Sequence, residues 1–190
     1  MNQEIVTIVS GLPRSGTSMM MKMLEAGGIE VLTDHVREAD KDNPKGYYEF
    51  ERVKQLEHDK AWVADAHGKV VKVISALLRH LPEDHTYRIV FMRRKIEEIL
   101  ASQRKMLVRR GEDPDKVEDA KMALLFKRHL KQVLKWMDEQ PNVEFIEISF
   151  NQTVKDPMTQ AERIDEFLGG GLDIEQMVNV VDPALYRQRR

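Results

Sequence analysis

The sequence predicts an α/β fold of three layers, in which a central, mostly parallel sheet of about five strands is flanked by helices. The first observation is an alternation along the chain: apolar runs of strand length, rich in valine and isoleucine, recur between longer segments with helical spacing. The second is that the first and fourth runs are almost continuously apolar, as in strands that are covered on both faces. Strands and helices that alternate in this way form a parallel sheet with helices on both faces.

The expected strands are the apolar runs themselves. In chain order they are EIVTIVS (4–10), IEVL (29–32), KVVKVIS (69–75), YRIVFM (87–92) and VEFIEIS (143–149). No repeat, low-complexity tract or domain boundary interrupts their order. We therefore expect residues 1–190 to form one domain, which is long enough to bury a sizeable core.

Four of the expected helices lie between or after these strands. One begins at the end of a glycine-rich loop at 11–18, and apolar residues at helical spacing predict two more over about 50–60 and 96–107. The last opens at the Asp-Pro pair 156–157, because proline is favoured in the first helical turn, and closes at the three glycines 169–171.

The longest helix is expected from Pro114 to about Glu139, with Asp113 as its cap and Pro114 at the first helical position. Its apolar residues form one stripe at helical spacing, which predicts a face buried in the core. The stripe consists of Val117, Ala120, Leu124, Leu130, Val133, Leu134 and Met137.

Composition excludes several classes of function. The chain has 30 basic and 32 acidic side chains, a formal net charge of -2 and 6% aromatic residues, so nucleic acid and anionic membrane are not expected partners. It has no cysteine, which excludes disulfides, zinc-thiolate sites and thiol nucleophiles. We find no signal peptide in the first ten residues and no run of 18 apolar residues, and we expect a cytoplasmic protein. Nothing in the sequence indicates an oligomeric state.

The loop GLPRSGTS (11–18) resembles the phosphate loop G-x-x-x-x-G-K-[ST], with Gly11, Gly16 and Ser18 in place and Thr17 where the lysine belongs. A glycine-rich turn between a buried strand and a helix presents several backbone N–H groups, and the helix dipole also favours an anion there. The alternative is a turn whose glycines serve geometry alone. The residues expected at the anion are Pro13, Arg14, Ser15, Gly16, Thr17 and Ser18.

The missing lysine argues against a triphosphate. In nucleotide triphosphatases this lysine reaches the outer phosphates, and an aspartate at another strand end helps to hold magnesium. Here the run YRIVFM is followed by Arg93 and Arg94, and no acid follows KVVKVIS. We therefore expect no metal, and a less charged anion that uses the guanidinium fork of Arg14.

A second anion site is suggested by Arg94 and Ser102. The arginine lies at a strand end, and the serine lies eight residues later, two turns into the next expected helix. Together they are placed to bracket another phosphate. The alternative reading is an arginine and a serine on a surface helix with no ligand.

The two motifs GLPRSGTS and RKIEEILAS (94–102) together resemble the sulfotransferases that use 3'-phosphoadenosine 5'-phosphosulfate (PAPS) as donor. The resemblance implies the P-loop fold, with residues 13–18 at the 5'-phosphosulfate and Arg94 and Ser102 at the 3'-phosphate. The segment at 147–169 is similar to the family's late strand, D-P turn and final helix ending in F-L-G. The segment DNPKGYYEFE (42–51) resembles one in bacterial members.

The chain also departs from the family's pattern. Many members carry a strand-end lysine before an Asp-Pro pair. Lys72 occupies the place of this lysine, but Val73 and Ile74 follow it instead. The R-K-G segment of the cytosolic animal enzymes has no match, since YRQRR (186–190) is only basic. The chain is also short, so any insertion that binds the acceptor is small.

The resemblance implies catalytic roles as well. Arg14 and Lys72 would stabilise charge on the bridging oxygen as the S–O bond breaks. Family members use histidine or glutamate as the base, which makes His35 the first candidate and Glu49 the next, with Glu38 also considered. Their structural alternatives are a solvated loop residue, a helix cap and an exposed acid, respectively. Asp34 is a weaker candidate, and the other histidines, His129 among them, are interpreted as structural.

The sequence therefore favours a sulfotransferase that uses PAPS to modify a hydroxyl or amine of a small molecule, saccharide or peptide. One alternative is a P-loop kinase of small molecules or nucleotides, which the absent lysine disfavours. The other is a non-catalytic nucleotide-binding protein of the same fold.

Overall fold

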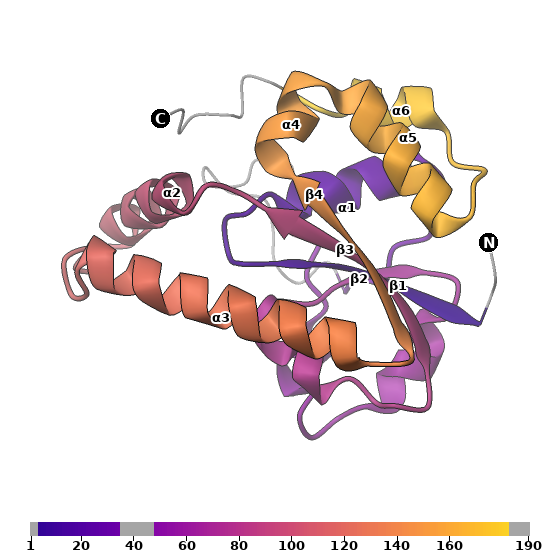
Figure 1. Ribbon diagram of the computed structural model, residues 1–190, viewed down its shortest axis with the longest axis horizontal. Helices are drawn as coiled ribbons and strands as arrows, with labels where there is room; N and C mark the ends of the chain where they lie inside the picture. The colour runs from indigo at the N-terminus through magenta and orange to yellow at the C-terminus, as the bar shows by residue number, and fades with distance from the viewer. Residues whose placement is uncertain (1–3, 35–47, 183–190) are drawn as a thin grey trace.

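A parallel sheet of four strands forms the centre of the computed structural model, which describes residues 4–34 and 48–182. The strand order is β2-β1-β3-β4, and every neighbouring pair is parallel (Figure 1). In the register, Ile8 lies opposite Val71 of β2 and Ile89 of β3, and Ile89 lies opposite Phe145 of β4. The strands are β1 (Ile5–Gly11), β2 (Val70–Lys72), β3 (Thr86–Arg93) and β4 (Val143–Ser149).

The strand expected at 29–32 is wrong as a full strand. Only Val31 forms a bridge, parallel to Val70, through hydrogen bonds from the Leu32 amide to the Val70 carbonyl (2.9 Å) and from the Val70 amide to the Glu30 carbonyl (2.8 Å). The chain then leaves the sheet, because the Thr33 hydroxyl donates to the Glu49 carbonyl. The sheet therefore has four strands and one added bridge at its β2 edge.

Alternating side chains of the strands divide the core into two clusters, one on each face of the sheet. Val6 and Ile8 of β1 belong to the first cluster, and Val9 belongs to the second. The second face is covered by α1 (Thr17–Ala26), α5 (Pro157–Leu168) and α6 (Ile174–Asn179), and three methionines and one leucine of α1 are fully buried there. This arrangement confirms the predicted three-layer α/β fold.

The first face is covered by α3 (Asp119–Glu139) and by the 3₁₀ helices η1 (Glu51–Gln55), η2 (Ala61–Ala66) and η3 (Ser75–His80). The sequence predicts a helix over about 50–60, but the structure has only the short 3₁₀ helix η1 there. The apolar residues of this segment do reach the core, as expected. By contrast, α2 (Ile96–Arg109) agrees with the expectation.

The longest helix starts at Asp119 rather than at Pro114. The Asp113 carboxylate accepts a hydrogen bond from the Asp115 amide at 2.8 Å, so it closes a turn instead of capping a helix. The expected buried stripe is also wrong over the first half of α3, where Leu124 is 59% exposed. This half extends past the end of the sheet beside α2, so no layer lies beneath it (Figure 1).

The helix predicted from the Asp-Pro pair is confirmed, but two short helices beside it were not expected. One, α4 (Phe150–Lys155), comes directly after β4, and the other is α6. The Asp156 carboxylate then caps α5 by accepting from the Thr159 amide at 3.3 Å, with Pro157 in the first turn. The helix ends at Gly169, whose φ of 98° is left-handed, as glycine allows.

All four parallel strands end at the same edge of the sheet, and the strand order reverses at β1. Such reversal points are where ligands bind in α/β sheets, outside the carboxyl ends of the strands. The loop after β1, Lys72 at the end of β2 and Arg94 after β3 all lie at this edge. Within the two described segments, no helix combines the length and the apolar character that a membrane crossing requires.

Candidate functional site

The loop between β1 and α1 is packed so tightly that two of its positions require glycine. Gly16 caps α1 with a φ of 100°, and a Cβ there would lie 2.4 Å from the ring of Phe150. A Cβ on Gly11 would lie 2.6 Å from the Ser15 hydroxyl and 2.7 Å from the Met92 carbonyl. The glycines of the motif are therefore set by close approach and by positive φ together.

The same loop has features that suit an anion. The N-cap of α1 is Gly16, which has no side chain to cap the first turn, and amides at the start of a helix can bind an anion. Ser15 is fully buried, and its hydroxyl finds no hydrogen-bond partner among residues 4–34 and 48–182. Arg14 has a φ of 69°, and such strain in a non-glycine residue is often found at functional sites. These observations fit a phosphate or phosphosulfate group in the loop.

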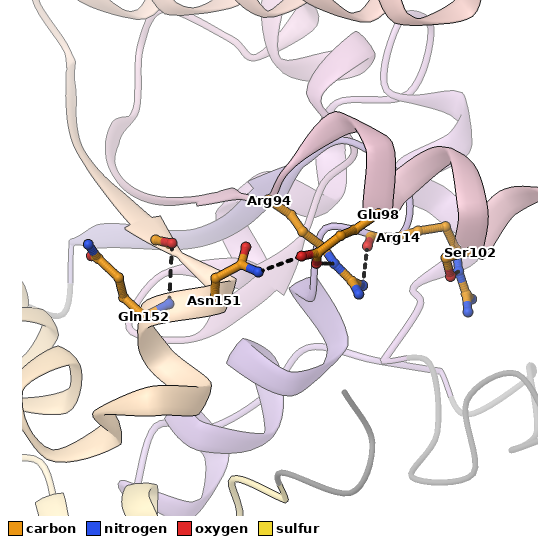
Figure 2. A network of polar contacts seen from close by, with 7 residues as sticks. Arg14, Arg94, Glu98, Ser102, Asn151 and Gln152 are labelled. Atoms are coloured by element: carbon orange, nitrogen blue, oxygen red, sulfur yellow. Dashed lines mark hydrogen bonds and ion pairs between the residues drawn. The ribbon is translucent and has the colours of Figure 1, made fainter. Parts of the chain in front are cut away.

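The structure joins the two anion sites that the sequence suggested separately. The Arg14 Nε donates to the Ser102 hydroxyl at 3.0 Å, although 88 residues separate them. The Arg94 Nη1 donates to the Arg14 carbonyl at 3.1 Å. Figure 2 shows Arg94 at the backbone carbonyl of Arg14 and Ser102 at the end of the Arg14 side chain. Arg14 therefore bridges the loop and the pair formed by Arg94 and Ser102.

Arg94 is itself held by a buried network that sequence analysis missed. Its Nε donates to the Glu98 carboxylate at 2.9 Å, and the other oxygen of that carboxylate accepts from the Asn151 amide at 2.9 Å (Figure 2). The guanidinium also lies 4.3 Å from the centre of the Phe150 ring. The Glu98 side chain is 0% exposed and that of Arg94 is 8% exposed. Arg94 lies just before α2, and its four-residue spacing from Glu98 in the first turn was the available sequence signal.

Two predicted catalytic residues meet at the end of β2. The Lys72 Nζ lies 3.9 Å from a Glu49 carboxylate oxygen, and both side chains are largely buried. The backbone of Glu49 is held by the Thr33 hydroxyl, which donates to its carbonyl at 2.8 Å. The cap of η1 is Phe50, so Glu49 does not take the capping role that was its structural alternative.

Of the remaining candidates for the base, one lies among the described residues and two do not. Asp34 accepts a hydrogen bond from the Glu51 amide at 2.5 Å, which fixes the start of η1. His35 and Glu38 lie outside the described residues, as do most of the segment at 42–51 and the basic segment at 186–190. No group of three or more potential metal ligands occurs in the part of the chain that the structure describes.

The arrangement is an edge with three cations and two acids, in which Arg94 pairs with Glu98 and Lys72 lies near Glu49. Two guanidinium groups and one ammonium group lie near the ends of three neighbouring strands, and the helix N-terminus adds partial positive charge. Cations near several strand ends suit an elongated anion with charge at two points. The pair at the end of β2 adds a lysine and a carboxylate at a third point.

Comparison with known proteins agrees with these features. The model of the sulfotransferase family matches residues 42–173. A sulfotransferase domain of the olefin synthase of Synechococcus PCC 7002 is 17% identical, with a TM-score of 0.60 over 100% of this chain and 89% of its own. A sulfotransferase from Mycobacterium avium is 14% identical, with a TM-score of 0.58 over 100% of this chain and 70% of its own.

A sulfotransferase domain of the curacin biosynthetic pathway is 12% identical, with a TM-score of 0.56 over 96% of this chain and 79% of its own. No curated protein sequence gave a match. At these identities the structural likeness shows a shared fold, whereas the family model covers most of the chain. The chain therefore belongs to the sulfotransferase family.

Proposed function

We propose that the protein transfers a sulfuryl group from PAPS to a hydroxyl or amine of an acceptor. Family membership supports sulfuryl transfer. The choice of donor rests on one observation, the contact of Arg14 with Ser102, which makes the phosphate loop continuous with a second cationic position. A donor with a phosphosulfate at one end and a 3'-phosphate at the other matches two such positions. A triphosphate, with all its charge at one end, does not.

In this proposal the loop holds the phosphosulfate end of the donor. The residues that contribute are Pro13, Arg14, Ser15, Gly16, Thr17 and Ser18. Backbone amides at the start of α1 and the hydroxyls of the loop supply hydrogen bonds, and no metal is needed to neutralise the smaller charge. Arg94 and Ser102 hold the 3'-phosphate, and Glu98 and Asn151 orient Arg94.

The transfer step conserves atoms and charge as follows. The acceptor oxygen or nitrogen forms a bond to sulfur while the bond from sulfur to the phosphate oxygen breaks, so 3'-phosphoadenosine 5'-phosphate leaves. The acceptor proton passes to a base, for which Glu49 is the described candidate. Arg14 and Lys72 stabilise the negative charge on the leaving phosphate oxygen, and loss of one such group reduces turnover by about 100-fold to 1000-fold.

The position of Glu49 beside Lys72 supports this assignment. The Lys72 Nζ lies 3.9 Å from a Glu49 carboxylate oxygen, so the cation and the base of this proposal lie side by side. His35 stays a second candidate for the base. Variants Glu49→Gln and His35→Gln separate the two, because the variant that lacks the base loses the acidic limb of the pH–rate profile.

Calorimetric titration tests the choice of donor. We expect wild-type protein to bind 3'-phosphoadenosine 5'-phosphate at least about 10-fold more tightly than adenosine 5'-phosphate without magnesium, because a hydrogen bond to a charged group contributes about 1.5–3 kcal/mol. Ser102→Ala should reduce this preference and leave the binding of adenosine 5'-phosphate nearly unchanged.

A matched control is Arg93→Ala. Arg93 is the neighbour of Arg94, but it pairs with the exposed Glu147 on β4 instead of facing the loop. Its loss should leave both affinities unchanged. Equal affinity of wild-type protein for the two nucleotides, or tighter binding of ATP with magnesium, would reject the proposed donor and favour the kinase alternative.

A further inference from the structure

A cavity of about 330 Å³ lies between η3 and α3, on residues that the proposed donor site does not use. Its lining includes Ser75, Leu78 and Arg79 from η3 and His129, Val133 and Trp136 from α3. The volume falls at the lower end of the range for small-molecule sites, which suits a molecule with one ring. The cavity is therefore a candidate site for a small ligand.

One end of the cavity is polar and already ordered. The Ser75 hydroxyl lies 2.8 Å from the Nε2 of His129, and Ser75 is 3% exposed. Burial lowers the pKa of His129, and the positive charge of Arg79 lowers it further. The imidazole is therefore neutral at pH 7, and its Nε2 is already bonded to the Ser75 hydroxyl, which retains hydrogen-bonding capacity for a ligand. A ligand hydroxyl, which both donates and accepts, suits that capacity.

The rest of the lining is an apolar wall with one cation at its rim. Leu78 and Val133 are buried, and Trp136 is half-buried, so an indole ring contributes to the wall. Arg79 is exposed and close enough for its charge to affect His129. A planar ring packs favourably against an indole, and a guanidinium binds a carboxylate through two parallel hydrogen bonds.

We propose that this cavity binds a small aromatic carboxylate that carries a hydroxyl, with its ring on Trp136, its carboxylate at Arg79 and its hydroxyl at Ser75, which His129 orients. One part of the inference rests on the proposed function: if the protein transfers a sulfuryl group, this class of molecule is its acceptor. Ser75 follows Lys72 by three residues, which limits the separation of their Cα atoms to about 10 Å. The cavity is thus placed beside the end of β2.

The two tryptophans of the chain provide a test with an internal control. Trp62 is fully buried in the core and packs edge-on against Phe50, whereas Trp136 lines the cavity. In a ¹⁵N–¹H spectrum we expect 4-hydroxybenzoate to shift the indole signal of Trp136 and leave that of Trp62 unchanged. An unchanged Trp62 signal in each variant also shows that its core is intact.

Matched probes and variants assign the two ends of the ligand. Arg79→Gln should weaken the binding of 4-hydroxybenzoate by about 10-fold and leave the binding of 4-hydroxybenzyl alcohol nearly unchanged, since only 4-hydroxybenzoate has a carboxylate. Ser75→Ala should weaken the binding of 4-hydroxybenzoate by about 3-fold and leave the binding of benzoate unchanged, since benzoate has no hydroxyl. No shift of Trp136, equal shifts of both indoles, or preferences unchanged in both variants would overturn the site.

Turnover tests the acceptor class separately. With PAPS present, we expect the sulfate ester of 4-hydroxybenzoate and no product from benzoate, measured by mass spectrometry. Binding without turnover, in protein that turns over PAPS with another acceptor, would overturn the acceptor assignment. The spectra are recorded without nucleotide, so a failure of the cavity to bind leaves the donor proposal untouched. A failure of nucleotide binding is seen independently by calorimetry.

Discussion

Replacement of Glu98 by glutamine should destabilise the fold and loosen the loop, because Glu98 is the buried centre of the network around Arg94. Its two carboxylate oxygens accept separately from the Arg94 Nε and the Asn151 Nδ2, each at 2.9 Å. A glutamine side chain has one acceptor oxygen, so one buried donor would face an NH₂ group. That orphaned donor costs about 1–3 kcal/mol.

Loss of the charge adds to this cost. The Arg94 side chain is 8% exposed, so little water is available to replace the carboxylate. Removing one partner of a buried ion pair costs about 3–5 kcal/mol in total. For a chain of this size, 1 kcal/mol corresponds to about 2–4 °C in Tm, so we expect a decrease of roughly 6–20 °C.

Urea unfolding and thermal unfolding measure this effect, and Glu97→Gln provides the control. Glu97 is the adjacent residue in the first turn of α2, but its side chain is exposed, so its loss should cost less than about 1 kcal/mol. A Glu98→Gln variant as stable as Glu97→Gln would refute the reasoning, since Arg94 would then need no buried partner.

Three further predictions concern the loop, the end of β2 and the cavity. Gly16→Ala should lower the free energy of unfolding, measured with urea, by about 2–5 kcal/mol, because alanine disfavours the left-handed backbone and its Cβ would overlap Phe150. Gly28→Ala, at the same φ of 100° with open space around it, should lose only the backbone part, and equal losses would exclude the overlap. Lys72→Ala should lower kcat by about 100-fold with little change in nucleotide affinity, and unchanged kcat would remove its role. Because the folded state holds the pKa of His129 below its unfolded value of about 6.5, the unfolded state protonates first as the pH falls. Its contribution to the free energy of unfolding is present above that value and declines below it. The free energy of unfolding should therefore fall less steeply between pH 8 and pH 5.5 in His129→Asn than in the wild type. An equal dependence on pH in the two proteins would contradict this.

The sequence predicts most of the donor side of the site because its signals are local. Glycine spacing between a buried strand and a helix predicts the loop, and the eight-residue spacing relates Arg94 after one strand to Ser102 in the helix that follows it. The contact of Arg14 with Ser102 has no such signal, because it depends on which strands are neighbours in the sheet. The stacking of Arg94 on Phe150 was missed for the same reason.

The errors in the fold have a common physical cause. Helical periodicity in α3 continues beyond the sheet, so the pattern predicts burial of Leu124 where no layer is present to cover it. An apolar run at 29–32 predicts a strand, but only one residue pairs before Thr33 turns the chain toward Glu49. Local pattern reports what a segment prefers, whereas burial and contacts depend on the neighbouring layer.

A crystal structure of the complex with 3'-phosphoadenosine 5'-phosphate tests the central claim most directly. We predict that the 5'-phosphate lies against the amides of the loop at 11–18, and that the 3'-phosphate lies within hydrogen-bond distance of Arg94 and Ser102. A nucleotide whose 3'-phosphate contacts neither residue, or one bound away from the carboxyl ends of the strands, would contradict the account.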